Sequence, residues 1–285
     1  MVALARILSW MPFRVNVFGR KRDAIVAVSE IFYGSNKLKR VKFRGHVLDF
    51  TGSDHFKIFA FAPVNLLRDF EQSDLGRWMT ANLKAEDRFV DIGANLGGYS
   101  FMAKSLGAEV DLFEPVPDLA RVLKKNERAF GRCHTIALSD ETGTVTFNIS
   151  DSNVGGSSIE ASTQGWEKSG YARQVEVDRV SFDEVFSAEI RRGEKFKLIK
   201  IDVEGHETSV VRGMEGALSG GLIEHLWCEV RGDDSDRNPG TFREVCAILA
   251  KYNFEAFVCE NGVKRPFDPE KSNAPQFFDL LFESS

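Results

Sequence analysis

The chain has little cysteine, and the cysteines that it has lie far apart. Four occur in 285 residues, at intervals that lack the short paired spacing of a zinc site. Three of them sit in apolar stretches, where free cysteine is usually buried. We therefore expect reduced, buried thiols, no bound metal and a cytoplasmic location. The four are Cys133, Cys228, Cys246 and Cys259.

Basic charge and long hydrophobic runs are also lacking. The 37 lysines and arginines are outnumbered by 42 acidic residues, for a net charge of -5. A nucleic-acid-binding protein usually has a basic excess, so DNA and RNA are not expected partners. The apolar start at 1–12 is broken by Arg6 and Pro12, which argues against a signal peptide and a transmembrane helix. This segment either forms a short membrane-surface helix or packs on the domain.

What the chain does contain is the alternation of an α/β protein. Hydrophobic residues make up 43% and charged residues 28%, the composition of a soluble globular protein. From residue 88 onward, short apolar runs alternate with stretches of helical period. This pattern predicts a Rossmann-like, mostly parallel sheet of seven strands with helices on both faces. The strands are expected at about 88–93, 109–115, 133–139, 197–203, 225–230, 254–260 and 277–283.

Two regions depart from this alternation. Residues 1–85 are expected to form a small N-terminal α/β extension, a candidate substrate cap, ahead of a catalytic domain at 86–285. The basis is β-like alternation at 41–62 followed by a helical period at 66–83. Within the catalytic domain, 140–196 is expected to be an insertion at the active edge of the sheet or a lid.

The central functional signal is the segment 88–100, an apolar strand that ends in a glycine-bearing turn and opens a helix. Glycines allow the backbone to approach a ligand closely, and the helix start offers free N–H groups. A dinucleotide enzyme would have G-x-G-x-x-G there, with a pyrophosphate on the helix. This turn instead consists of Asp91, Gly93, Asn95 and Gly97. A carboxylate at the turn disfavours pyrophosphate but suits the amino-acid end and the sulfonium cation of S-adenosylmethionine.

An acidic residue follows at the distance expected for a ribose contact. Twenty-one residues after Gly93, the second strand ends at Glu114, whose carboxylate can accept hydrogen bonds from both ribose hydroxyls. We expect the adenine to lie near Pro115 and Asp140. Together with the turn, Glu114 predicts S-adenosylmethionine as the cofactor, with NAD as the competing adenosine cofactor. The alternative is that these residues only shape a tight turn and a solvated strand end.

The second signal is the fourth predicted strand, which has charges on one face. Lys200, Asp202 and Glu204 alternate along it and therefore share a face. Such charges are costly to bury unless they are paired or functional. At the carboxyl end of the strand they would stand beside the cofactor, so we expect Asp202, Glu204 or His206 to be the catalytic base. The alternative is a structural ion pair with Lys200, and Glu229 is a further candidate.

With both signals in view, the chain resembles the FkbM family of S-adenosylmethionine-dependent methyltransferases. The resemblance covers about residues 70–260 and rests above all on Lys-Ile-Asp-Val-Glu-Gly-His-Glu at 200–207. The segments 90–97, 113–115 and 137–140 add to it. It implies a class I methyltransferase fold, typically with a reversed final strand, and O-methylation of varied acceptors such as sugars and natural products.

These observations predict an S-adenosylmethionine-dependent methyltransferase acting on a hydroxyl or carboxyl group of a small-molecule or glycan acceptor. Methyl transfer to a hydroxyl group requires that the acceptor oxygen and the methyl group be aligned at about 3 Å, and it requires a base that removes the hydroxyl proton. No third ligand at a diagnostic spacing calls for a metal. The competing hypothesis is a non-catalytic protein that uses the same fold to bind an adenosine cofactor or a partner. Turnover of an acceptor would distinguish the enzyme from such a binding protein.

Overall fold

The structure is a computed structural model, and it describes residues 40–50, 63–149, 173–232, 241–271 and 277–284. The predicted membrane-surface or packed segment at 1–12 lies outside these ranges. Among the described residues, no helix is both long and apolar enough to cross a membrane.

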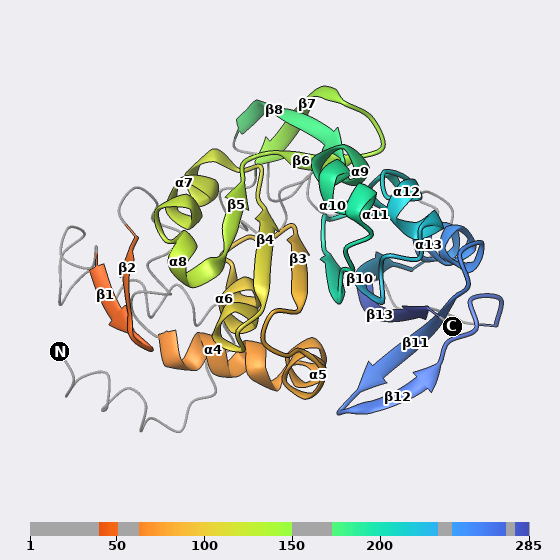
Figure 1. The fold of residues 1–285 in the computed structure, drawn as a ribbon, viewed down its shortest axis with the longest axis horizontal. Helices are drawn as coiled ribbons and strands as arrows, with labels where there is room; N and C mark the ends of the chain where they lie inside the picture. The colour runs from red at the N-terminus through yellow and green to blue at the C-terminus, as the bar shows by residue number, and fades with distance from the viewer. Residues whose placement is uncertain (1–39, 51–62, 150–172, 233–240, 272–276, 285) are drawn as a thin grey trace.

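A large sheet forms the centre of the molecule (Figure 1). Its strands are β3 (Arg88–Ile92), β4 (Glu109–Phe113), β5 (Arg132–His134), β9 (Leu198–Ile201), β10 (His225–Arg231), β11 (Phe254–Glu260), β12 (Val263–Pro266) and β13 (Phe277–Ser284). They are ordered β12-β11-β13-β10-β9-β3-β4-β5. The strands from β10 to β5 run parallel, whereas β13 is antiparallel to both of its neighbours. The mostly parallel sheet and the reversed final strand are confirmed.

The sheet has eight strands, one more than predicted. β11 and β12 form an antiparallel hairpin across Asn261 and Gly262, whose φ angles are 52° and 78°. Asn-Gly is a strong hairpin signal because both turn positions need positive φ. The prediction missed β12 because that strand is exposed along its whole length and has no apolar alternation.

The prediction of a single strand at 133–139 was wrong, because only its first part, β5, belongs to the main sheet, and its last residues join a separate three-stranded sheet. The chain leaves the main sheet after His134, and β6 (Ala137–Ser139) pairs with β8 (Arg173–Ser181). β7 (Gly143–Ile149) pairs with the other side of β8. Figure 1 shows β6, β7 and β8 together at one end of the molecule. The predicted strand is interrupted because β8, which follows later in the chain, offers an edge with which β6 pairs.

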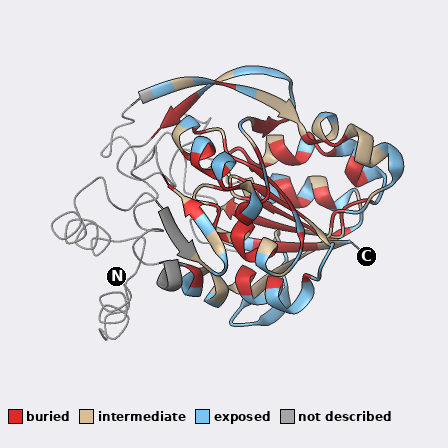
Figure 2. Cartoon of the chain, turned by 60° about the vertical axis from the view of Figure 1, so that its left-hand side comes forward, coloured by how far each residue is buried: buried red, intermediate tan, exposed pale blue. Residues whose placement is uncertain are grey.

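Helices cover both faces of the main sheet, as predicted (Figures 1 and 2). The first face carries α4 (Pro63–Gln72), α5 (Asp74–Asn82), α6 (Gly98–Ser105), α7 (Pro117–Lys125) and α8 (Glu127–Phe130). The second carries α9 (Phe182–Val185), α10 (Ser187–Arg192), α11 (Glu207–Arg212), α12 (Glu215–Ser219) and α13 (Thr241–Ala250). Successive strand residues alternate between the faces, so Phe89 joins the first core and Val90 the second. The buried side chains in Figure 2 concentrate along these strands.

The N-terminal elements pack into the first-face core. β1 (Arg40–Phe43) and β2 (His46–Asp49) form a hairpin, and Leu48 is buried in that core. The Asn126 side chain accepts a hydrogen bond from the Asp49 N–H at 2.7 Å and donates one to the Asp49 carbonyl at 2.8 Å. A domain boundary after residue 85 stays a prediction.

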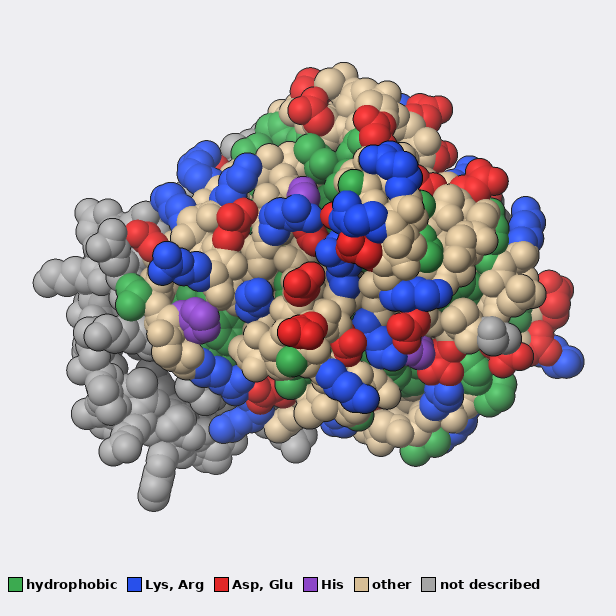
Figure 3. Space-filling model, viewed as in Figure 1, with side chains coloured by type: hydrophobic (Ala, Val, Ile, Leu, Met, Phe, Trp, Pro, Cys, Tyr) green, Lys and Arg blue, Asp and Glu red, His purple; other side chains and the backbone are tan. Residues whose placement is uncertain are grey.

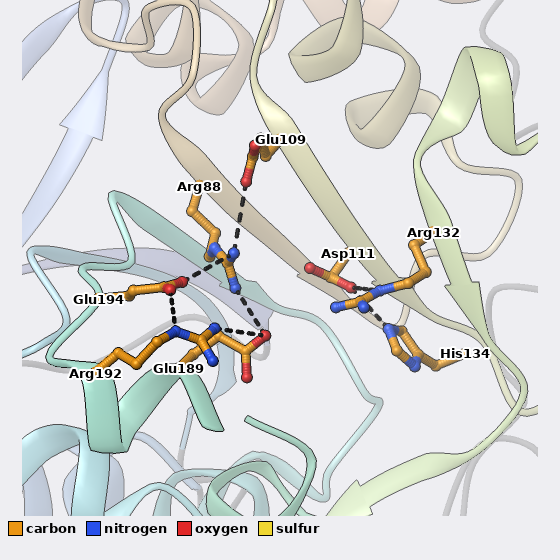
Figure 4. Close-up of polar contacts among 8 residues, drawn as sticks. All are labelled: Arg88, Glu109, Asp111, Arg132, His134, Glu189, Arg192 and Glu194. Carbon is orange, nitrogen blue, oxygen red and sulfur yellow. Dashed lines mark hydrogen bonds and ion pairs between the residues drawn. The ribbon is translucent and has the colours of Figure 1, made fainter. Parts of the chain in front are cut away.

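Charged side chains on the second face are paired with one another (Figure 4). Arg88 at the start of β3 lies 3.1 Å from a carboxylate oxygen of Glu194. Asp111 on β4 accepts hydrogen bonds from Arg132 at 2.5 Å and His134 at 2.8 Å. Desolvation acts to raise the pKa of Asp111, but these hydrogen bonds hold it below its usual value. These charges satisfy each other, so they are a structural feature of the second face of the sheet.

Candidate active site

The glycine turn after β3 is built for a close approach between two strand ends. Gly93, Asn95 and Gly97 have φ angles of 77°, 52° and 74°, in the left-handed region that glycine adopts without strain. A Cβ added at Gly93 would lie 1.8 Å from the carbonyl oxygen of Asp202. Glycine is therefore required at this position, because the turn and the end of β9 are in contact there.

Asp91 connects the turn to the neighbouring elements. Its carboxylate is 1% exposed, accepts a hydrogen bond from the Ser100 hydroxyl at 2.7 Å and lies 3.2 Å from the Lys200 ammonium. In the turn itself, the Asn95 Oδ1 atom is buried and accepts no hydrogen bond from the described residues. A ligand that donates an N–H or O–H group would satisfy this acceptor.

Glu114, predicted to hold the ribose, is buried beside the same turn. Its two carboxylate oxygens accept hydrogen bonds from the Asn95 and Val116 N–H groups, both at 2.8 Å. Desolvation outweighs these bonds and raises the pKa of Glu114 to about 7. Each oxygen retains a lone pair, so the carboxylate can still accept hydrogen bonds from two hydroxyl groups.

Asp140 and His206 both contact the hydroxyl group of Ser139. The Ser139 hydroxyl donates to Asp140 Oδ1 at 3.1 Å and lies 3.0 Å from His206 Nε2, so it accepts from His206 when that nitrogen is protonated. His206 is buried and directly precedes α11, which packs on the second face. The contact joins two elements that carry predicted site residues.

The ion pair between Lys200 and Asp202, the structural alternative for the fourth predicted strand, is present at the end of β9. The Lys200 ammonium lies 3.2 Å from Asp91 Oδ1 and 3.2 Å from Asp202 Oδ2, and it donates to the Gly93 carbonyl at 3.1 Å. Desolvation opposes the charge of this buried lysine, but the two carboxylates outweigh it and hold the pKa of Lys200 above its usual value. Lys200 therefore ties the cofactor turn to the first carboxylate of the candidate site.

Three carboxylates gather where β9 and β10 end. One oxygen from each of Asp202, Glu204 and Glu229 lies within 4.8 Å of the others, and we call these residues the carboxylate cluster. Desolvation, reinforced by the charge of Asp202, raises the pKa of Glu204 to about 8. Desolvation and the charges of Asp202 and Glu204 raise the pKa of Glu229 to about 9. Like charges at this distance cannot all ionise at low cost, so the cluster holds protons near neutral pH.

The cluster can do two kinds of chemistry. A carboxyl group with a pKa near 8 is well matched to a general base at neutral pH. Three carboxylates at this spacing could also hold a divalent cation, so the expectation of no metal stays a prediction.

Several residues beside the cluster were not singled out from the sequence. Asp279 of β13 lies opposite Glu229 in the sheet, and desolvation followed by the charge of Asp202 raises its pKa to about 6. The Tyr99 hydroxyl donates to Ser73, the N-cap of α5, at 3.1 Å, and Lys200 lies 5.7 Å from the Tyr99 ring centre. Period-two alternation in the predicted strand at 277–283 is the signal that could have indicated Asp279.

The strand order, the reversed strand β13 between β10 and β11, and the glycine turn after β3 define a class I methyltransferase fold. The family model described as the methyltransferase FkbM domain matches residues 91–256. The chain therefore belongs to the FkbM family of S-adenosylmethionine-dependent methyltransferases, and S-adenosylmethionine is its cofactor.

A curated relative is the hexuronic acid methyltransferase AglP of Haloferax volcanii, which is 30% identical over 169 residues. The alignment covers 57% of this chain and 65% of the relative, so the chain spans just under two thirds of the relative's length.

Solved structures with lower identity also match. The magnesium protoporphyrin IX methyltransferase of Synechocystis PCC 6803 with bound SAM is 10% identical, with a TM-score of 0.40, and the match covers 78% of this chain and 82% of that one. The putative methyltransferase yhhF of Escherichia coli is 11% identical, with a TM-score of 0.41, and the match covers 86% of this chain and 98% of that one.

Proposed function

We propose that this chain transfers a methyl group from S-adenosylmethionine to an oxygen of a sugar acceptor, at a hydroxyl or carboxyl group. The observation that carries the proposal is the carboxylate cluster next to the glycine turn, at the carboxyl ends of adjacent parallel strands. Ligands of open α/β sheets bind at such strand ends. The relative named for hexuronic acid supports a sugar acceptor.

The residues around the turn fit the cofactor. When bound, S-adenosylmethionine supplies a methyl group made electrophilic by the sulfonium cation. The methionine end would lie against Asp91, Gly93, Asn95 and Gly97, where the unsatisfied Asn95 Oδ1 can accept from its ammonium. Glu114 would accept from the ribose hydroxyls, and the adenine would lie near Pro115 and Asp140. The nearby carboxylates favour a cationic ligand over a pyrophosphate.

For a hydroxyl acceptor, we assign Glu204 as the base. It belongs to the carboxylate cluster, and its raised pKa of about 8 makes it a better proton acceptor than an ordinary glutamate. The Asp202 carboxylate is paired with Lys200 and would orient the acceptor. His206, whose Nε2 lies against Ser139, would position the adenine side of the site. A carboxyl acceptor is already ionised at neutral pH and needs no base.

Composition and surface support the remaining assignments. Acidic and basic side chains are interspersed over the described residues seen in Figure 3, which favours a small-molecule or glycan acceptor over nucleic acid. All four cysteines are free. Cys133, Cys228 and Cys246 are buried as expected, whereas Cys259 is only partly buried. Free thiols support a cytoplasmic enzyme. Residues 1–85 would then be an extension that caps the acceptor, ahead of the catalytic domain at 86–285.

The test is a label-transfer assay with purified protein and methyl-labelled S-adenosylmethionine. Acidic and neutral sugars are offered in parallel, and both labelled product and S-adenosylhomocysteine are measured. We expect both to form with at least one sugar. Cofactor binding without label transfer to any sugar offered would contradict the proposal and favour a binding protein on the same fold.

A further inference from the structure

Arg231 lies at the rim of the proposed acceptor site. It is the last residue of β10, two positions beyond Glu229, and therefore on the same face of the strand. A Cβ added at Gly205 would lie 3.1 Å from Arg231 Nη2, so the guanidinium packs against the turn that carries Glu204. Desolvation raises the pKa of Glu204, and the charge of Arg231 acts against that rise.

The guanidinium of Arg231 forms no hydrogen bond or ion pair within the part of the chain that the structure describes. The Arg231 Nε atom is buried without a hydrogen bond, and Arg231 Cζ lies 5.3 Å from the centre of the Phe277 ring. Other arginines behave differently: Arg132 and Arg179 lie 2.5 and 2.6 Å from carboxylate oxygens. An arginine carries five N–H donors, and leaving a buried donor unpaired is unfavourable.

This unpaired cation stands beside an excess of negative charge. The carboxylate cluster would repel an anionic acceptor. Lys200 cannot offset this repulsion, because it already contacts Asp91, Asp202 and the Gly93 carbonyl. Arg231 is therefore the cation at this rim, among the described residues, with donors available for a ligand. The planar guanidinium matches a carboxylate with two parallel hydrogen bonds.

We infer that Arg231 binds the carboxylate of an acidic sugar acceptor, an inference that rests on the proposed methyl transfer to a sugar. Phe277, which is 38% exposed, lies opposite Arg231 in the sheet and offers an apolar surface beside the guanidinium. Aromatic walls with a few placed polar groups are typical of small-molecule sites. Arg231 thus determines specificity for an anionic over a neutral sugar.

A carboxylate also occurs at the methionine end of the cofactor, and the fold favours the acceptor as the source. The glycine turn follows β3, whereas Arg231 ends β10, and β9 lies between these two strands. The cofactor turn is therefore separated from Arg231 by β9, the strand that Asp202 and Glu204 follow. The experiment below distinguishes the acceptor carboxylate from the cofactor carboxylate as the ligand of Arg231.

The experiment measures binding of methyl β-glucuronoside and methyl β-glucoside to the full chain, saturated with S-adenosylhomocysteine, by calorimetry. Arg231→Gln removes the charge, Arg231→Lys keeps it without the planar fork, and Arg265→Gln is a matched control at an exposed arginine of β12. We expect Arg231→Gln to weaken glucuronoside binding about 10- to 100-fold. Arg231→Lys should recover part of this loss, and Arg265→Gln should bind as the wild type does.

The affinity for S-adenosylmethionine is measured on the same variants. Arg231→Gln should leave it within about twofold, and a loss matching that of the glucuronoside would assign the guanidinium to the cofactor and overturn the inference. Failure of the wild type to bind the glucuronoside, or equal binding by Arg231→Gln, would also overturn it. Arg231-dependent binding without label transfer would support this inference while contradicting the proposed function.

Discussion

A carboxylate oxygen of Asp202 lies 3.2 Å from the ammonium nitrogen of Lys200. The same nitrogen lies 3.2 Å from Asp91, so one lysine bridges a buried carboxylate of β3 and a half-exposed one after β9. Breaking a buried pair by removing one partner is costly, because the other charge is left without compensation.

Replacement of Lys200 should therefore destabilise the fold. We expect Lys200→Met to lower the free energy of unfolding by about 3–5 kcal/mol, because Asp91 is 1% exposed and would lose its cation. The double variant with Asp91→Asn should recover part of the loss. Urea denaturation measures both, with Lys251→Met at an exposed position as the control. A loss below about 1 kcal/mol would show that the pair contributes little.

The raised pKa values in the carboxylate cluster predict stability that falls as pH rises. Burial raises the pKa of Glu204 to about 8 and that of Glu229 to about 9, above the value of 4.5 that applies to both when unfolded. The folded chain thus binds more protons between these values, so the contribution of these two groups to stability is complete below about pH 4.5 and is lost as pH rises through about 8 and 9. Denaturation across this range should show a shallower decline for Glu229→Gln. Glu215→Gln, exposed on α12, should follow the wild type.

The base assignment predicts a specific loss of turnover. Glu204→Gln should remain folded and bind S-adenosylmethionine but lose about 10²-fold in kcat with a hydroxyl acceptor. The wild-type rate should rise with pH through about 8, because the base must be deprotonated. Asp202→Asn and His206→Ala serve as comparisons. A large loss in His206→Ala with near-normal Glu204→Gln would move the base to the histidine, and near-normal turnover in all three would exclude a catalytic base among them.

The ribose assignment predicts a pH-dependent cofactor affinity. Glu114→Gln should weaken S-adenosylmethionine binding by roughly 1.5–3 kcal/mol, because a charge-assisted pair of hydrogen bonds is lost. The pKa of Glu114 is raised to about 7 by desolvation, so wild-type affinity should rise between pH 6 and 8 and that of the variant should not. Calorimetry measures both, with Glu255→Gln as an exposed control. Tighter binding of NAD than of S-adenosylmethionine would contradict the whole cofactor site.

Much of the fold was predictable because its signals are local. The apolar run at 88–93 and the glycines that follow it specify a strand, a turn and a helix within a few residues. The same holds for the helix at 241–250, whose buried positions repeat at helical spacing. The break between β5 and β6 was not predictable, since it depends on pairing with β8, which follows more than thirty residues later.

By itself, the sequence determined which residue types stand at the ends of the parallel strands, because chain order and alternation place Asp91, Glu114 and Asp202 there. Only the tertiary structure decided what those residues do. Lys200 could have paired with either nearby carboxylate, and it contacts one partner two positions away and another 109 positions away. The raised pKa of Glu229 and the unpaired guanidinium of Arg231 likewise arise from neighbours that the sheet assembles. Desolvation and charge proximity depend on distances in space, and the sequence does not contain those distances.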